Sequence, residues 1–391
     1  MQHQPRSKRG NLTREAILKN AALEFTAQGF HATSVAEVCR RAGIANGSFY
    51  QYFDKKQDVF DSIVASAREA FYQSVKGRRN LPSLCNGIFD YFHEYGSLFQ
   101  VFREAEFNWG SRFSISFYQP VIDEIKENTS LNEAQTWAFL GAICFLGLHY
   151  GIWPGKSVAT KTRKSFLEIA EKGIAAQNRQ CWRQLKWPSL NIAKIPNEQR
   201  EVHKTKRLLL NTARNLFSTK GYGRCKVSEI TAKAEVALGT FYVHFQSKYE
   251  ILEEVVREIK EDFLAHTSLV ADCGLSRVEK ERNFLLAFLY ALESRADSYR
   301  IVREAEFAEA SIGRGYYESI AKDYALSIEE TRDRDQSLIA EDPRILAWVI
   351  MGTAHFTGMR WILWNEREQP KPDLSAIAST LKWLFCGISP P

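Results

Sequence analysis

The chain has 391 residues, 45% of them hydrophobic and 25% charged, which is typical of soluble globular proteins with sizeable cores. Its seven cysteines are scattered and form no C-x-x-C pair or Cys/His cluster, so we expect reduced thiols, no metal site and no cofactor. The basic N-terminus lacks the apolar segment of a signal peptide, and the longest apolar run, 138–148, is too short to cross a bilayer. We therefore expect a cytoplasmic protein of two to three domains without a membrane segment.

The net charge of +6 is concentrated in two segments. Residues 1–60 carry nine Lys and Arg against five Asp and Glu, and residues 196–250 carry ten against five. The remainder of the chain is net negative. A local excess of positive charge favours a polyanion such as nucleic acid as a partner, although a solvated basic face has the same signature.

The same two segments contain an internal repeat. Residues 14–64 and 206–256 align without a gap at an offset of 192, with 14 of 51 positions identical. The identities include apolar, glycine and lysine positions that shape a small helical module, among them Phe25/Phe217, Gly29/Gly221, Gly47/Gly239, Phe49/Phe241, Tyr50/Tyr242 and Lys56/Lys248. Two copies of a DNA-reading module in one chain would perform the task that other proteins perform as dimers.

In the first copy, apolar residues at helical spacing predict a helix over 16–25 that Gly29 ends, because glycine tolerates positive φ. Ser34, followed three residues later by Glu37, is a capping box that begins a second helix. Gly43 ends that helix, and residues 44–52 predict a third, short helix after a tight turn. This order predicts a helix-turn-helix.

The third helix of such a module lies in the major groove, so its exposed side chains should contact DNA. Asn and Gln can bond adenine edges through two hydrogen bonds, while Tyr50 and Lys56 are placed to contact phosphates. For each residue alone, an ordinary polar surface position is the alternative. The residues predicted to contact DNA are Thr33, Asn46, Gly47, Ser48, Tyr50, Gln51, Tyr52 and Lys56 in the first copy, and Leu238, Gly239, Thr240, Tyr242, Val243, His244 and Lys248 in the second.

The strings GIANGSFYQYFDKK at 43–56 and VALGTFYVHFQSK at 236–248 resemble the recognition-helix signature of the TetR family of transcriptional regulators. The resemblance covers about 100 residues in two pieces. It implies an all-α fold, in which each unit has a three-helix DNA-binding domain and a larger helical ligand-binding and dimerisation domain. It also implies a regulator that most often acts as a repressor and is released by its ligand.

The second copy departs from this pattern. Glu235 replaces the turn glycine, and Cys225 and Lys226 replace Thr33 and Ser34. Neither replacement is a good N-cap, which costs the following helix about 1 kcal/mol. The second recognition helix also has fewer side chains that can read a base through two hydrogen bonds. Loose DNA binding, a different half-site and a packing role all remain open for this module.

The segments after each module also correspond. The pentad REAEF occurs at 103–107 and 303–307, an offset of 200, and residues 141–153 parallel 352–364 at an offset of 211. The whole chain is therefore a duplicated unit of about 190 residues. We predict DNA-binding domains at 10–60 and 200–254, regulatory domains at 61–185 and 255–391, and a linker at 186–199. Basic residues ahead of each module would lie along phosphates or in the minor groove, or would form a solvated linker.

The regulatory halves are rich in aromatic residues, which by default form helical core. The family resemblance nevertheless places an effector pocket here, and an aromatic lining would suit a small apolar or aromatic effector. Within each pentad, Arg and Glu three residues apart lie on one helix face, where the alternative is a structural ion pair. For His355, the alternative is a core histidine whose hydrogen bonds are satisfied within the protein. The residues predicted to bind ligand are Arg103, Glu106, Trp109, Phe113, Trp137, Phe145, Arg303, Glu306, Trp348 and His355.

The resemblance further implies that the last two helices of each unit form a four-helix bundle. Their counterparts are 132–153 with 162–177, and 343–364 with 374–385. Glycines recur along the long helices at matching places and predict close backbone approach across the bundle: Gly141, Gly147, Gly352 and Gly358. Because both sets of helices lie in one chain, we predict a monomeric, intramolecular pseudo-dimer.

No catalytic motif such as G-x-S-x-G, a Walker A loop or H-E-x-x-H is present, so the chain does not read as an enzyme. We expect a sequence-specific transcriptional regulator that binds a double-stranded DNA operator of asymmetric sequence, and that a small apolar or aromatic effector releases. The alternative is a helical ligand- or protein-binding module whose second half has lost specific DNA recognition. The identities of effector and operator, and the choice between repression and activation, stay open.

Overall fold

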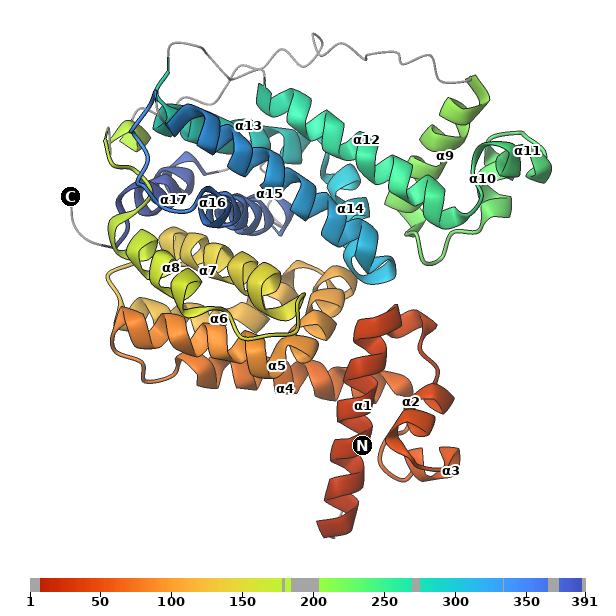
Figure 1. The fold of residues 1–391 in the computed structure, drawn as a ribbon. Helices are drawn as coiled ribbons and strands as arrows, with labels where there is room; N and C mark the ends of the chain where they lie inside the picture. Colours follow the sequence, from red (N-terminus) through yellow and green to blue (C-terminus); the bar gives the residue numbers. More distant parts are fainter. Residues whose placement is uncertain are drawn as a thin grey trace. The chain divides into compact units, whose positions relative to one another are not determined.

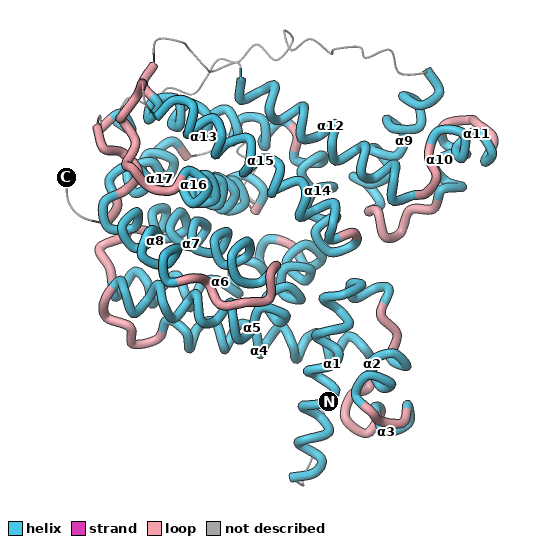
Figure 2. The backbone as a smooth tube through the Cα atoms, viewed as in Figure 1, coloured by secondary structure: helices cyan, strands magenta, loops and turns pink. Residues whose placement is uncertain are grey.

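The computed structural model describes residues 8–177, 180–183, 204–268, 275–332, 334–364 and 373–388. Every regular element within these residues is a helix, and the one β contact among them is an isolated bridge between Ala175 and Leu338 (Figure 2). The predicted all-α fold is confirmed. The predicted linker at 186–199 lies outside the described residues. None of the described helices combines the length and the apolar character needed to cross a membrane.

The first copy forms a helix-turn-helix module followed by longer regulatory helices (Figure 1). Its elements are α1 (Lys8–Ala32), α2 (Val35–Ala42), α3 (Asn46–Phe49), α4 (Lys56–Val75), α5 (Leu81–Trp109), α6 (Ser111–Asn128), α7 (Glu133–Gly147), the π-helical turn η1 (Leu148–Ile152), α8 (Thr160–Lys172) and the 3-10 turn η2 (Cys181–Arg183). The second copy repeats this order, with the long helix of the pentad divided into two.

The elements of the second copy are α9 (Lys204–Lys220), α10 (Val227–Lys233), α11 (Leu238–His244), α12 (Lys248–Ser268), α13 (Arg277–Ser294), α14 (Ala296–Ala308), α15 (Ala310–Arg332), α16 (Pro343–Gly358), the π-helical turn η4 (Met359–Leu363) and α17 (Leu374–Cys386). Irregularities recur at the same offsets as the sequence motifs. Tyr95 leaves helical geometry inside α5, with φ −120°, and Arg295 does so between α13 and α14, with φ −133°. The π-helical turns η1 and η4 are also equivalent, so the duplication extends through the regulatory halves.

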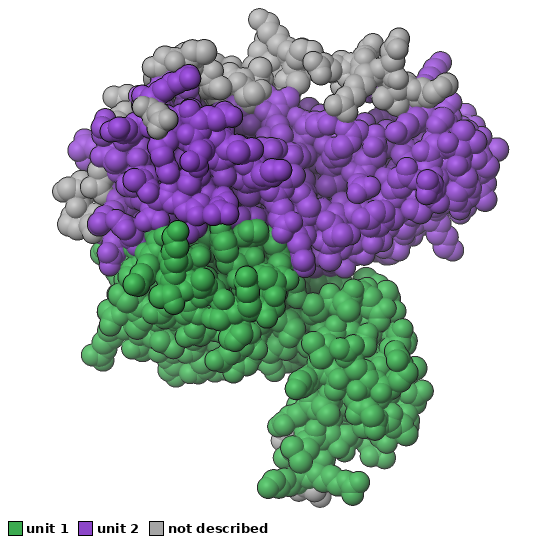
Figure 3. All heavy atoms as spheres, in the orientation of Figure 1, with its two compact units in different colours: residues 1–131, 143–167 green, residues 132–142, 168–391 purple. Residues whose placement is uncertain are grey.

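The chain divides into two compact units (Figure 3). Unit 1 comprises residues 1–131 and 143–167, and unit 2 comprises 132–142 and 168–391. This division differs from the predicted division by sequence, because the first turns of α7 and the end of α8 belong to the unit that holds the second copy. Those first-copy segments are strongly apolar and find their buried neighbours there.

Inside unit 2, the ends of α8 and α17 cross through equivalent contacts. The Ile174 N–H donates to the Leu384 carbonyl at 2.8 Å, and the Ile388 N–H donates to the Ala170 carbonyl at 2.9 Å. An offset of 214 converts one hydrogen bond into the other. When residue i contacts residue j and the counterpart of j contacts the counterpart of i, the interface has two-fold character.

The glycines that end these helices make the crossing possible. Gly173 and Gly387 adopt φ values of 75° and 70°, in the left-handed region that favours glycine. A Cβ at Gly173 would lie 2.2 Å from the backbone of Phe385, and a Cβ at Gly387 would lie 2.4 Å from the backbone of Glu171. Both positions therefore need glycine for conformation and for space.

Gly141 on α7 lies against α16 within unit 2. A Cβ added there would sit 2.3 Å from the carbonyl oxygen of Gly352, and the Trp137 ring packs beside Phe356 and Trp364. The predicted close approach across the bundle is therefore confirmed for this pair. The small residues allow two helix backbones to pack without intervening side chains.

The prediction was wrong for the other two glycines. A Cβ at Gly147 would meet the Phe92 ring at 2.1 Å, and one at Gly358 would meet Leu292 at 2.4 Å. Each glycine thus makes room for a side chain of its own regulatory half. The two pairs are equivalent in the duplication, so this packing belongs to the unit itself and not to the contact between copies.

Candidate DNA-binding site

The first module follows the predicted local structure. Gly29 interrupts α1 with φ 79°, and the Ser34 backbone N–H donates to the Glu37 carboxylate at 2.7 Å. In return, the Ser34 hydroxyl accepts the Glu37 N–H at 3.2 Å, which completes the capping box. Gly43 ends α2 in the left-handed conformation, with φ 68°. These signals set where α2 begins and where α3 can follow.

The recognition helix α3 is shorter than predicted, since it covers 46–49 instead of 44–52. After Phe49 the backbone tightens: the Gln51 and Tyr52 N–H groups bond three residues back, to Ser48 and Phe49. Its counterpart α11 extends over seven residues. Asn46 has a lower helix propensity than the equivalent Leu238, which is consistent with this difference.

The burial pattern of the two recognition segments is identical. Phe49 and Phe53 are buried, as are Phe241 and Phe245, and they anchor each segment to its module. Most of the predicted base- and phosphate-contacting positions are exposed: Asn46, Gly47, Tyr50 and Gln51 in the first copy, and Leu238, Gly239, Tyr242 and Val243 in the second. Ser48, Tyr52, Thr240 and His244 are half-buried. Each module therefore presents the surface expected of a major-groove reader.

Three predicted DNA contacts are corrected by the structure: Thr33, Lys56 and the equivalent Lys248 of the second copy. The Thr33 side chain is buried and donates to the Gly29 carbonyl at 2.8 Å, so it faces the module interior. The Lys56 ammonium donates to the carbonyls of Phe30 and Thr33, both at 2.5 Å. Burial lowers the pKa of Lys56, while nearby Glu104 acts to raise it. This ammonium holds the turn between α1 and α2 instead of projecting toward a phosphate.

The second copy repeats the lysine arrangement. Lys248 donates to the carbonyls of Tyr222 and Cys225, each at 3.0 Å, and burial likewise lowers the pKa of Lys248. One basic residue in each copy, at equivalent positions, lies beside the phenylalanine at the end of the recognition segment. Arg14 lies 5.1 Å from the ring centroid of Phe53, and Lys206 lies 5.4 Å from that of Phe245. These contacts place two cations of the basic segments beside the reading surface.

The predicted weaknesses of the second module are visible. Glu235 adopts φ 55° where the first copy has glycine, and it is the one non-glycine residue with positive φ in the described part of the chain. At the start of α10, Glu229 still accepts the Lys226 N–H at 2.8 Å. Lys226 makes no side-chain cap. The helix keeps half of the capping box that Ser34 completes in the first copy.

The predicted ligand residues of the first half fall into separate groups. Arg103 and Glu106 form a buried ion pair, with Nε and Oε2 3.7 Å apart. Trp109 stacks edge-on against Phe113, with ring centroids 4.6 Å apart, and is 38% exposed. Trp137 belongs to unit 2, at the contact between α7 and α16, and Phe145 is buried in the core of unit 1.

The predicted ligand residues of the second half come together. Arg303 donates from Nη1 to His355 Nε2 at 3.0 Å, and its Nε lies 3.6 Å from Glu306. The other ring nitrogen, Nδ1, bonds to the hydroxyl of Tyr299, and Tyr317 donates to Glu306 at 2.6 Å. An arginine has only donors, so Nε2 must be unprotonated, and the neutral imidazole carries its proton on Nδ1. Trp348, the remaining predicted residue, is buried.

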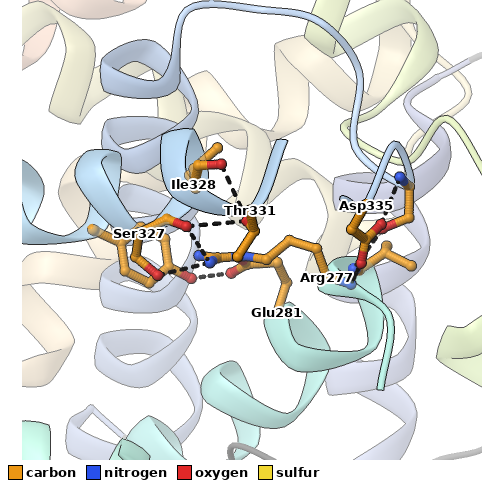
Figure 4. A network of polar contacts seen from close by, with 9 residues as sticks. Arg277, Glu281, Ser327, Ile328, Thr331 and Asp335 are labelled. Atoms are coloured by element: carbon orange, nitrogen blue, oxygen red, sulfur yellow. Dashed lines mark hydrogen bonds and ion pairs between the residues drawn. The ribbon is translucent and has the colours of Figure 1, made fainter. Parts of the chain in front are cut away.

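A second buried network, at the start of α13, was not predicted from the sequence (Figure 4). Arg277 lies 2.6 Å from Glu281 and donates to the Ser327 hydroxyl at 2.8 Å. Its backbone N–H donates to Asp335, which also accepts the Ser337 N–H at 2.8 Å. At the offset of 200 that relates the pentads, the first copy has Gly77 and Leu81 at the places of Arg277 and Glu281, so no repeated motif marked this site.

The network fixes a loop that contacts the first copy. The Ser337 carbonyl accepts the Ala176 N–H at 2.7 Å, and the Ile174 carbonyl accepts the Ile339 N–H at 2.9 Å. The buried ion pair therefore supports the same crossing region of unit 2. Among the described residues, no group of three or more His, Cys, Asp or Glu is arranged to hold a metal ion.

The family model described as bacterial regulatory proteins, tetR family, matches the chain twice, at residues 17–63 and 209–255. Both matches fall on the modules described above. Together with the internal repeat, they show that the chain carries two DNA-binding domains of the type found in this family.

The regulator YdgC of Bacillus subtilis strain 168 is 39% identical over 80 residues, which are 20% of this chain and 39% of YdgC. The regulator YxbF of the same organism is 21% identical over 295 residues, 70% of this chain and 75% of YxbF. A TetR-like transcriptional regulator from Rhodococcus sp. RHA1 has a solved structure with 21% identity, covering 46% of this chain and 93% of that chain, and a TM-score of 0.35. The chain thus spans less than half of the length of YdgC.

Proposed function

We propose that this chain, which carries the DNA-binding domain of the TetR family twice, is a transcriptional regulator that acts as a single-chain pseudo-dimer. The observation that carries this proposal is the reciprocal crossing in unit 2, where Ile174 and Ile388 make equivalent backbone hydrogen bonds. A two-fold interface that is satisfied within one chain leaves no equivalent surface for a second chain.

Light scattering on the purified protein, free and bound to DNA, tests this proposal. We expect one chain of 44.8 kDa in the free protein and one chain per operator in the complex. A dimer in both states would show that the two copies do not close on each other.

We further propose that the operator is asymmetric. Asn46 and Gln51 expose amide groups suited to adenine edges, whereas Leu238 and Val243 expose apolar side chains suited to thymine methyl groups. The first module would read a well-specified half-site. The second would read a more degenerate half-site about one helical turn away, or a multiple of that. A regulator of this kind would act on chromosomal DNA in the cytoplasm.

The regulatory halves are proposed to bind a small apolar or aromatic effector that lowers operator affinity. The buried network of Arg303, Glu306 and His355 supports a polar anchor in the second half, and the partly exposed Trp109 with Phe113 supports an aromatic contact in the first. Linkage requires operator DNA to weaken effector binding by the same factor. Calorimetry with and without operator tests this, and equal affinities would remove that ligand as an effector.

A second candidate function has its own support. The second module combines the left-handed Glu235, a weaker helix cap and an apolar surface on which Val243 is 78% exposed. These features favour a protein- or ligand-binding surface that no longer recognises a DNA sequence. Gel-shift binding with the second module intact or disabled separates the two functions. Specific binding that needs only the first module would favour this second candidate.

A further inference from the structure

Each REAEF pentad presents its charged residues in two directions. Arg303 and Glu306 face the buried network of the regulatory core, whereas Glu304, between them in sequence, reaches the DNA-binding module. The first copy has the same arrangement, with Glu104 contacting the module of its own half. One stretch of helix therefore contacts the regulatory core and the reading domain at the same time.

In the first copy, the backbone N–H and the backbone carbonyl of Phe30 are both hydrogen-bonded to charged side chains. The Phe30 N–H donates to both carboxylate oxygens of Glu104, at 2.9 and 3.0 Å. From the other side, the Lys56 ammonium holds the carbonyls of Phe30 and Thr33. Glu104 of the regulatory helix α5 and Lys56 of α4 thus hydrogen-bond the backbone of the segment that leads from α1 into α2.

The second copy grips the equivalent turn in the same way. Glu304 accepts the N–H groups of Tyr222 at 2.7 Å and Gly223 at 3.0 Å. Lys248 donates to the carbonyls of Tyr222 and Cys225. The modules are repeated at an offset of 192 and the pentads at 200, so the second copy has a net insertion of eight residues between them. The same contact is nevertheless present in both copies.

We propose that Glu104 and Glu304 are positioning residues that set the orientation of the recognition helices from within the regulatory halves. The gripped turn leads directly into α2 and α3, or α10 and α11, so a shift of the pentad helix moves the base-reading surface. This inference rests on the proposed DNA-binding function, and it names the route by which that function is regulated. Neither glutamate lies on the reading surface.

The environment of Glu104 gives this grip a measurable signature. Burial raises the pKa of Glu104 to about 7, against the hydrogen bond from the Phe30 N–H and the charge of Lys56, which both lower it. The charged groups that act here are Lys56 on α4, which lowers the pKa of Glu104, and Glu37 on α2, which in turn acts on Lys56. An ionised carboxylate accepts at both oxygens, and protonation converts one of them into a donor. The grip should therefore weaken as the pH falls below 7.

The experiment compares the full-length protein with the Glu104→Gln variant on an operator obtained by selection with the purified wild type. At pH 8 we expect the variant to bind about tenfold more weakly, and the ratio of the two affinities to approach one at pH 6. Because burial disfavours the charged carboxylate, the unfolding midpoint at pH 8 should not fall. Glu94→Gln, which removes the same charge from an exposed position of α5, is the matched control and should change neither quantity.

Amide hydrogen exchange in the DNA-free protein gives a readout that does not depend on an operator. Glu104→Gln should speed exchange at Phe30 and leave the core of α5 unchanged. Wild-type affinity in the variant at pH 8, a joint loss of affinity and stability, or unchanged exchange at Phe30 would each overturn the positioning role. If wild type bound no operator, the proposed function would fail, and the exchange comparison would still decide whether Glu104 holds the turn.

Discussion

The two recognition segments share one packing arrangement and differ in exposed chemistry. Residues 45–53 and 237–245 have the same burial class at every position, and buried phenylalanines anchor both. At the exposed positions, amides in the first copy are replaced by Leu238 and Val243 in the second. Packing constrains the size and shape of buried side chains, whereas exposed positions are free to change. A duplicated module can therefore keep its fold while its two copies come to read different half-sites.

The two recognition segments differ at exposed positions, whereas the two regulatory halves differ at buried positions. His355 in the second half corresponds to Cys144 in the first, and Tyr299 corresponds to Phe99. The first half fills this region with rings, and burial raises the pKa of the Cys144 thiol so that it stays protonated. The second half has a hydrogen-bonded network instead. The interior polarity of the two halves is thus distinct, and an effector that needs a polar anchor would distinguish them.

The largest expected effect tests the contact between copies. Gly141→Ala places a methyl group 2.3 Å from the Gly352 carbonyl oxygen, so the helices must separate. We expect the free energy of unfolding to fall by about 1–3 kcal/mol. The control is Gly315→Ala in α15, where nothing lies within 4 Å of the new Cβ and a gain of up to about 1 kcal/mol is expected. Denaturant titration measures both, and equal effects would place Gly141 outside any close contact.

The next effect separates the two reading surfaces. Gln51→Ala should cost ~1–3 kcal/mol on the preferred base of one half-site and leave the other half-site unchanged. Val243→Ala should cause a smaller loss, confined to the second half-site, because it removes only apolar contact. Binding selections with each variant report the two halves separately. Damage spread over both half-sites by either change would argue against independent reading.

A smaller effect tests the strained turn of the second module. Glu235→Gly should raise stability by ~1 kcal/mol, because glycine adopts the left-handed conformation without the steric cost that a Cβ carries. Gly43→Ala, the reverse change at the matching position, should lower stability by a similar ~1 kcal/mol. Thermal unfolding checks both. If Glu235→Gly had no effect, the turn would not be a weakness of the second copy.

The smallest effect concerns salt dependence. Lys55→Ala removes an exposed ammonium beside the first recognition segment and should lower the slope of log affinity against log salt by about one. Lys56→Met should leave that slope unchanged, since the Lys56 ammonium is held by carbonyls of the protein. Affinity titrations at several salt concentrations compare the two variants. A reduced slope for Lys56→Met would restore its predicted phosphate contact.

Features that depend on local pattern were predictable from the sequence. The duplication, the capping box at Ser34, the missing cap at Lys226 and the buried phenylalanines all follow from residue type and spacing. Partners across the fold were not predictable. The pentads were recognised as repeated and charged, but nothing in their spacing indicated that Glu104 meets the Phe30 N–H or that Lys56 turns inward. Helical periodicity identifies which residues share a face, and tertiary packing decides what that face meets.

Selection of binding sites from random DNA by the purified wild-type protein tests the central claim most directly. A single chain with two unlike reading surfaces predicts an asymmetric motif, with one sharply specified half-site and one degenerate half-site rich in thymine. Two copies of the chain joined through the first module would instead present identical surfaces. Recovery of a perfect palindrome would contradict the single-chain pseudo-dimer.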